Sequence, residues 1–107
     1  MRYVGNIIYD EILKQDSAEL VIFGAGKTGR KIYAYLEING LSHKLKCFCD
    51  RNEALWGQVI DGVMIKNPED ILGDGEKYHF LIGGRYTDEI LEILQERGIQ
   101  NVHLLLL

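Results

Sequence analysis

Proline, cysteine and tryptophan are scarce in this chain of 107 residues, which contains one, two and one of them respectively. Cys47 and Cys49 are too few for a disulfide framework, and their spacing is not that of a zinc site. On a strand both side chains would point to the same face, so we expect two free thiols in a core. No apolar run approaches the roughly 20 residues that cross a bilayer, and no charged-then-apolar leader opens the chain. These features predict a cytoplasmic protein with no membrane partner.

Positive charge is also limited. Twelve Lys and Arg face sixteen Asp and Glu, for a net charge of -4 and a pI near 5.3. An acidic chain without a basic stripe is poorly suited to a phosphate backbone, so we do not expect nucleic acid as a partner. The length and the average composition, 47% hydrophobic and 26% charged, predict one domain over residues 1–107.

Helix-like and strand-like segments alternate along the chain, which is typical of an α/β fold with a parallel sheet. Apolar runs predict strands over 20–23, 45–49, 63–65, 79–82 and 102–106. Apolar spacing of three and four predicts helices over 27–38, after Asn67-Pro68, and over 88–97. Right-handed crossovers then give a doubly wound parallel sheet of about five strands in the order 3-2-1-4-5.

The remaining segments have simpler expectations. Val4, Ile8 and Ile12 recur every fourth residue and predict an extra helix over 4–15, within an N-terminal segment (1–17) that packs on the domain. Residues 50–62 look like a loop. Gly40 is expected to end the helix over 27–38, Asn67 to cap the small helix, and Thr87 to cap the helix over 88–97.

Gly24, Gly26 and Gly29 form a G-x-G-x-x-G that directly follows a predicted strand and opens a predicted helix. In this context the first glycine permits the tight turn, the second lets a phosphate approach the backbone, and the third lets helix and strand pack closely. The helix start then presents amides to an anion. The competing interpretation is a tight turn that binds nothing. A Walker loop does not fit, and a loop for S-adenosylmethionine fits poorly because Thr28 replaces its next glycine.

Asp50 lies 21 residues after Gly29, at the end of the second predicted strand. An acidic residue in this place hydrogen-bonds a ribose diol and repels a 2′-phosphate. The neighbouring Arg51 leaves the choice between NAD and NADP open, because an arginine there accommodates the 2′-phosphate of NADP. An Asp that merely begins a turn is the other interpretation.

The fourth predicted strand ends in Gly83-Gly84-Arg85-Tyr86, near the point where ligands bind in open α/β sheets. There Arg85 reaches a phosphate and Tyr86 stacks on a ring; the equally compatible alternative is that Arg85 is a solvated loop residue and Tyr86 packs on the helix. Trp56 either covers a base or pins its loop to the core. The candidate cofactor-binding residues are Gly24, Ala25, Gly26, Lys27, Thr28, Gly29, Asp50, Arg51, Gly83, Gly84 and Arg85.

Catalytic groups are not evident. The three histidines, His43, His79 and His103, have no ligand spacing, no tyrosine has a lysine four residues later, and Ser17 and Ser42 are in no nucleophile elbow. We therefore expect a chain that binds a nucleotide but has no catalytic residues and no metal of its own.

Four stretches of the sequence, covering roughly residues 19 to 106, resemble a Rossmann-like module of bacterial polysaccharide biosynthesis proteins. They are Val21-Ile22-Phe23-Gly24-Ala25-Gly26-Lys27-Thr28-Gly29-Arg30, Phe48-Cys49-Asp50, Trp56-Gly57-Gln58-Val59-Ile60-Asp61-Gly62-Val63 and Pro68-Glu69-Asp70. The module is similar to the N-terminal domain of CapD-type nucleotide-sugar epimerases and dehydratases, to the module attached to FkbM-type methyltransferases, and to the N-terminal domain of sialic-acid-type sugar acetyltransferases. The resemblance implies a phosphate role for the three loop glycines and a ribose role for Asp50, with NAD(H), NADP(H) or a nucleotide-sugar as ligand.

This chain departs from those families because it carries none of their catalytic parts. The leading hypothesis is a nucleotide-binding module that works beside a catalytic partner. The alternatives are a minimal NAD-dependent oxidoreductase or epimerase subunit, a CoA-binding domain, and an interaction module without a ligand. The terminal run Leu104-Leu105-Leu106-Leu107 motivates the last of these and a possible homodimer.

Overall fold

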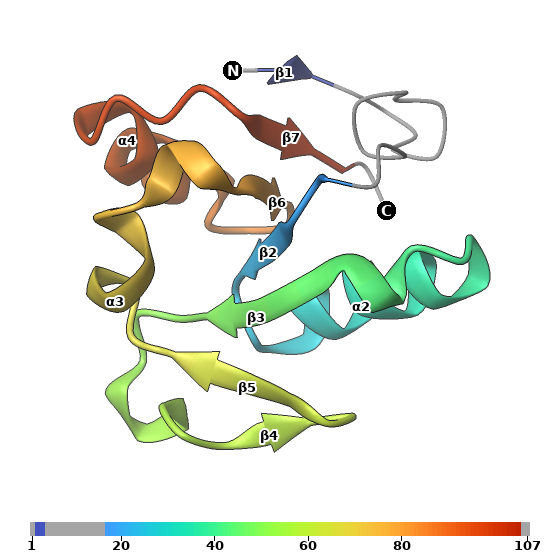
Figure 1. Cartoon of the computed structure of the whole chain (residues 1–107). Coiled ribbons are helices and arrows are strands. Elements are labelled where there is room, and N and C mark those ends of the chain that lie inside the picture. Colours follow the sequence, from blue (N-terminus) through green and yellow to red (C-terminus); the bar gives the residue numbers. More distant parts are fainter. Residues whose placement is uncertain (1, 4–16, 106–107) are drawn as a thin grey trace.

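The computed structural model describes residues 2–3 and 17–105, and this part of the chain contains a seven-stranded sheet in the order β1-β7-β6-β2-β3-β5-β4 (Figure 1). The strands are β1 (Arg2–Tyr3), β2 (Leu20–Phe23), β3 (Leu45–Cys49), β4 (Val59–Ile60), β5 (Val63–Lys66), β6 (His79–Ile82) and β7 (Val102–Leu104). The helices are α2 (Lys27–Ile38), α3 (Glu69–Leu72) and α4 (Thr87–Glu96), with single 3₁₀ turns at Ser42–Lys44, Glu53–Leu55 and Gly75–Lys77. Over the described ranges no helix is long and apolar enough to cross a membrane.

The central order β5-β3-β2-β6-β7 is parallel throughout and confirms the predicted order 3-2-1-4-5. The prediction of about five parallel strands is wrong at the edges, because the sheet is mixed. Strand β4 pairs antiparallel with β5, inside the segment 50–62 that was expected to be a loop. Asp61 and Gly62 join these two strands with φ of 50° and 82°. An Asp-Gly pair is a strong hairpin signal, so the sequence did contain the information for this turn.

The sequence pattern gave no sign of a strand at the N-terminus. Arg2–Tyr3 is a strand parallel to β7, ahead of the segment predicted to be a helix. The predicted helix over 4–15 lies outside the described residues. A strand of two residues depends on its partner, so the pattern of its own side chains does not predict it. At the other end β7 stops at Leu104, earlier than the predicted 106, and Leu105 is buried in the core.

Helices cover both faces of the sheet, as in a doubly wound fold (Figure 1). Alternate residues of β2 divide between two cores because successive side chains on a strand point to opposite faces. Leu20 and Ile22 pack in the core that contains α2. Val21 and Phe23 pack in the core that contains α3 and α4. Cys47 and Cys49 both belong to this second core, which confirms that they share a face.

The predicted helix boundaries are mostly confirmed. Helix α2 spans the expected residues and ends at Gly40, whose φ is 71°, and the next N–H, of Leu41, donates to the carbonyl of Leu36. Asn67 accepts the N–H of Glu69 at 3.0 Å, as a cap should. The prediction for Thr87 is wrong: it is the first helical residue, and its hydroxyl donates to the carbonyl of Gly84 instead.

Candidate functional site

A cavity of about 790 Å³ opens at the carboxyl ends of β2, β3 and β6. This is the place where the strand order reverses, since β3 lies on one side of β2 and β6 on the other. Ligands of open α/β sheets bind at such a switch point. The lining residues are Phe23, Gly24, Gly26, Lys27, Thr28, Gly29, Ile32, Asp50, Arg51, Asn52, Leu55, Gly83, Arg85, Tyr86 and Ile90.

The glycine loop forms one wall of this cavity. Gly24 has a φ of 120°, a conformation that side chains other than glycine rarely adopt, and its N–H donates to the carbonyl of Cys49 at 2.7 Å. A Cβ on Gly29 would overlap the carbonyl oxygen of Gly24, so α2 packs directly on the turn. A Cβ on Gly26 would meet nothing within 4 Å. The third glycine is thus required by packing, whereas Gly26 borders open space.

The first turn of α2 faces the same cavity without a side-chain cap. Gly26 is the N-cap residue, no side chain hydrogen-bonds to this end, and the first turn contains no acidic residue. Lys27 adds a positive charge there. The N–H groups at the start of a helix together carry about half a positive charge, which attracts anions. This wall therefore suits a phosphate.

The carboxylate of Asp50 is held in place beside the glycine loop, at the end of the neighbouring strand β3. Its Oδ2 accepts the N–H of Ala25 and its Oδ1 accepts the N–H of Asn52, both at 2.8 Å. Asp50 is half-buried, and Ala25 is buried with its N–H directed at this carboxylate. A carboxylate offers about four acceptor positions, so each oxygen keeps capacity for one more hydrogen bond. The sequence pattern did not indicate that Asp50 also ties the glycine loop to the loop after β3.

Two further contacts fix the loop that follows β3. The indole N–H of Trp56 donates to the carbonyl of Asp50 at 2.7 Å, and Trp56 is half-buried outside the cavity lining. This hydrogen bond ties the loop to the end of β3. The guanidinium of Arg51 donates to Glu89 Oε2 of α4 at 2.9 Å. Sequence reasoning missed Glu89, because nothing in the pattern connects residues 38 positions apart.

The end of β6 forms the far wall. A Cβ on Gly84 would lie 2.6 Å from the hydroxyl of Thr28, and one on Gly83 would lie 2.9 Å from the carbonyl of Leu105. These glycines allow β6 to end close against the start of α2. Arg85 and Tyr86 follow them, line the cavity and are exposed. The cavity thus gathers three basic side chains around one carboxylate.

The histidines and cysteines lie elsewhere. His79 on β6 and His103 on β7 face each other, with Nδ1 of the first 3.0 Å from Nε2 of the second. Residues 24 positions apart meet only because their strands are neighbours, so spacing could not predict this pair. Burial raises the pKa of the Cys49 thiol well above its ordinary value and also raises that of Cys47. Over the described ranges no group of His, Cys, Asp and Glu has the geometry to hold a metal ion.

Of the eleven residues singled out as cofactor-binding, nine line one cavity, and Ala25 and Gly84 are chain neighbours of lining residues. The apolar part of the lining comes from Phe23, Ile32, Leu55 and Ile90, none of which the sequence pattern assigned to a ligand site. A signal was present for Ile90, since it opens the apolar face of α4 beside the Gly83–Tyr86 turn.

Comparison with solved structures identifies the architecture. The chain resembles RSP, a Rex-family repressor, with a TM-score of 0.64, 22% identity, and coverage of 89% of this chain and 48% of that one. It matches RSP in complex with beta-NADH equally well, with a TM-score of 0.64, 23% identity, and coverage of 91% and 50%. The fold is Rossmann-like. The chain spans about half the length of these repressor chains.

No family model matches the chain, and no curated protein matches it. The resemblance to modules of polysaccharide biosynthesis therefore gains no support from these comparisons. The likeness to RSP is at the level of the fold, because identity near one residue in five leaves ligand and partner open.

Proposed function

We propose that this chain is a binding domain for a dinucleotide of the NAD(H) type. One observation carries the proposal: the uncapped start of α2, with Gly26 bordering open space, and the carboxylate of Asp50 line a single cavity. The first feature suits a pyrophosphate and the second a ribose, and both moieties belong to the same ligand. The similarity to an NADH-bound repressor supports this choice of nucleotide.

Different residues of the cavity would bind different parts of the ligand. The pyrophosphate would accept hydrogen bonds from the first N–H groups of α2, with Lys27 and Arg85 supplying positive charge. The ribose hydroxyls would donate to the free acceptor positions of Asp50. Phe23 and Ile90 give the cavity apolar surface for a base, which is the usual composition of a nucleotide site.

The proposed role is binding without catalysis by this chain alone. NAD supplies hydride chemistry when bound, but the described residues around the cavity include no histidine, and the tyrosine there, Tyr86, is exposed on a loop. We propose that any reaction or readout depends on a partner domain or protein.

A nucleotide-sugar is the second candidate ligand. It carries the same diphosphate and ribose, and the resemblance to polysaccharide modules favours it. CoA is a weaker candidate, because its additional phosphate needs basic neighbours, and Arg51 is engaged by Glu89.

A thermal-shift panel tests these alternatives, with NAD⁺, NADH, NADPH, CoA, S-adenosylmethionine, UDP and UDP- and GDP-sugars at millimolar concentration. A ligand at about 100 times its Kd stabilises the folded state by about 2.7 kcal/mol, which raises Tm by several degrees for a domain of this size. We expect a shift with NADH or NAD⁺. A shift with sugar nucleotides alone would move the assignment to the second candidate, and a flat panel would contradict both.

A matched pair of glycine variants locates the binding. Gly26 and Gly73 both have open space where a Cβ would go, and neither has a positive φ, so both tolerate a side chain structurally. Gly26→Val should weaken NADH binding by about tenfold or more, the equivalent of one charge-assisted hydrogen bond lost. Gly73→Val, which lies outside the cavity, should bind as the wild type does. Equal affinity of the two variants would contradict the phosphate site.

A further inference from the structure

The ion pair between Arg51 and Glu89 joins two walls of the cavity. Arg51 belongs to the loop after β3, and Glu89 to the first turns of α4 after β6. The guanidinium nitrogen is 2.9 Å from Glu89 Oε2, and the side chains are 44% and 59% exposed. Arg51 itself lines the cavity. The pair thus connects Arg51, a cation that lines the cavity, to α4. Among the described residues, no other hydrogen bond joins the loop after β3 to this helix.

Arg51 directly follows the carboxylate expected to bind the ribose. In dinucleotide sites of this kind an acidic residue accepts a hydrogen bond from the 2′-hydroxyl, whereas a nearby arginine donates hydrogen bonds to a 2′-phosphate. The chain has both residue types side by side, so the sequence alone leaves NADH and NADPH undecided. In the structure, Arg51 already forms an ion pair with Glu89.

We propose that Glu89 is a positioning residue that sets selectivity for NAD(H) over NADP(H) by holding Arg51 away from the 2′ position. This inference rests on the proposed nucleotide function. A 2′-phosphate would compete with Glu89 for the guanidinium of Arg51, and it would lie near two carboxylates, Asp50 and Glu89. A 2′-hydroxyl requires neither change, since Asp50 accepts it without Arg51.

The size of the effect follows from the exposure of the pair. Exposed ion pairs are weak and are screened by salt. Release of Arg51 should therefore strengthen NADPH binding by about two- to fivefold at low salt. The affinity for NADH should stay the same, because its ribose contact does not involve Arg51.

Calorimetric titration of NADH and NADPH into four variants tests the proposal. Glu89→Gln removes the charge and should tighten NADPH but not NADH. Glu92→Gln is the matched control, because it removes the same charge from an exposed position on the same helix. Arg51→Ala should weaken NADPH, and in the double variant Glu89→Gln should no longer change NADPH affinity.

The outcomes separate the two claims. If wild-type protein binds neither dinucleotide, the proposed function fails and this inference falls with it. If NADH binds and Glu89→Gln leaves the NADPH-to-NADH ratio unchanged, or Glu92→Gln changes it equally, the function stands and the role of Glu89 is wrong. A ratio that shifts through Glu89 only while Arg51 is present supports the positioning role, which a merely structural residue would not reproduce.

Discussion

The backbone N–H of Ala25 donates to Asp50 Oδ2 at 2.8 Å, which ties the glycine loop to the end of the neighbouring strand. The same carboxylate accepts the N–H of Asn52, so one side chain organises two loops of the cavity. The ribose contact that we propose for Asp50 and its structural role therefore depend on the same side chain.

Asp50→Ala should lower the free energy of unfolding by about 2 kcal/mol, because two backbone N–H groups lose a charged acceptor that is partly exposed. Chemical denaturation measures this. Asp74→Ala is the control, since Asp74 is exposed and caps nothing with its side chain. Equal stability of the two variants would show that the carboxylate does not hold the loops.

Gly29→Ala should destabilise the fold by about 3 kcal/mol, because its Cβ would overlap the carbonyl of Gly24 and packing this tight does not relax cheaply. Gly73→Ala, whose Cβ would meet open space, should be neutral or slightly stabilising. Thermal unfolding of both compares them directly. A Gly29→Ala variant as stable as wild type would contradict the close approach of α2 to the turn.

Cys47 and Cys49 should resist thiol reagents in the folded protein, because both are buried and burial raises both pKa values, so little thiolate forms. Both should react once denaturant is added. Lys46→Cys is the internal control, because position 46 is exposed on the same strand. Rapid labelling of Cys49 in the native wild type would contradict its burial in this core.

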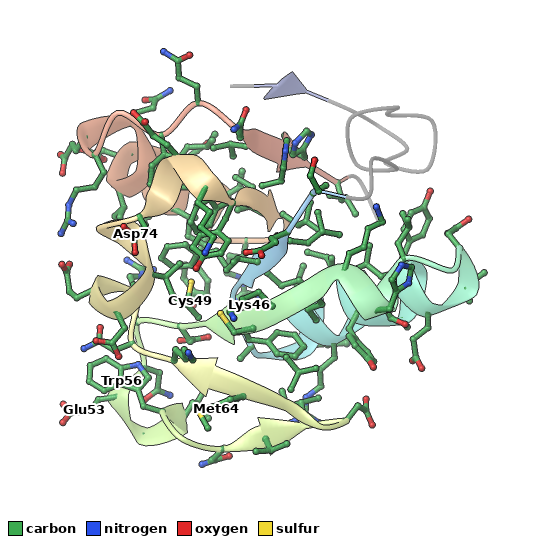
Figure 2. The ribbon with its side chains drawn as sticks, viewed as in Figure 1. Lys46, Cys49, Glu53, Trp56, Met64 and Asp74 are labelled. Carbon is green, nitrogen blue, oxygen red and sulfur yellow. The ribbon has the colours of Figure 1, made fainter. Side chains whose placement is uncertain are left out.

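Trp56, labelled in Figure 2, is the single tryptophan of the chain, and its indole N–H donates to the carbonyl of Asp50, a residue that lines the cavity. Its fluorescence should therefore change when NADH binds. Trp56→Phe keeps a ring but loses the donor, which should cost about 1 kcal/mol of stability. An emission spectrum that stays constant through saturation, with binding confirmed by calorimetry, would mean that this loop does not sense the ligand.

Local signals in the sequence predicted the Rossmann-like core: five apolar runs indicated β2, β3, β5, β6 and β7, and the glycine spacing indicated the start of α2. The Asp61-Gly62 pair is also a local signal, and it favours the β4–β5 hairpin. Only the tertiary structure decided that Asp50 anchors the glycine loop, that His79 meets His103, and that Arg51 is held by Glu89. These contacts join residues 24 to 38 positions apart, and a pairing at that distance depends on which strands and helices become neighbours, which no periodicity along the chain encodes.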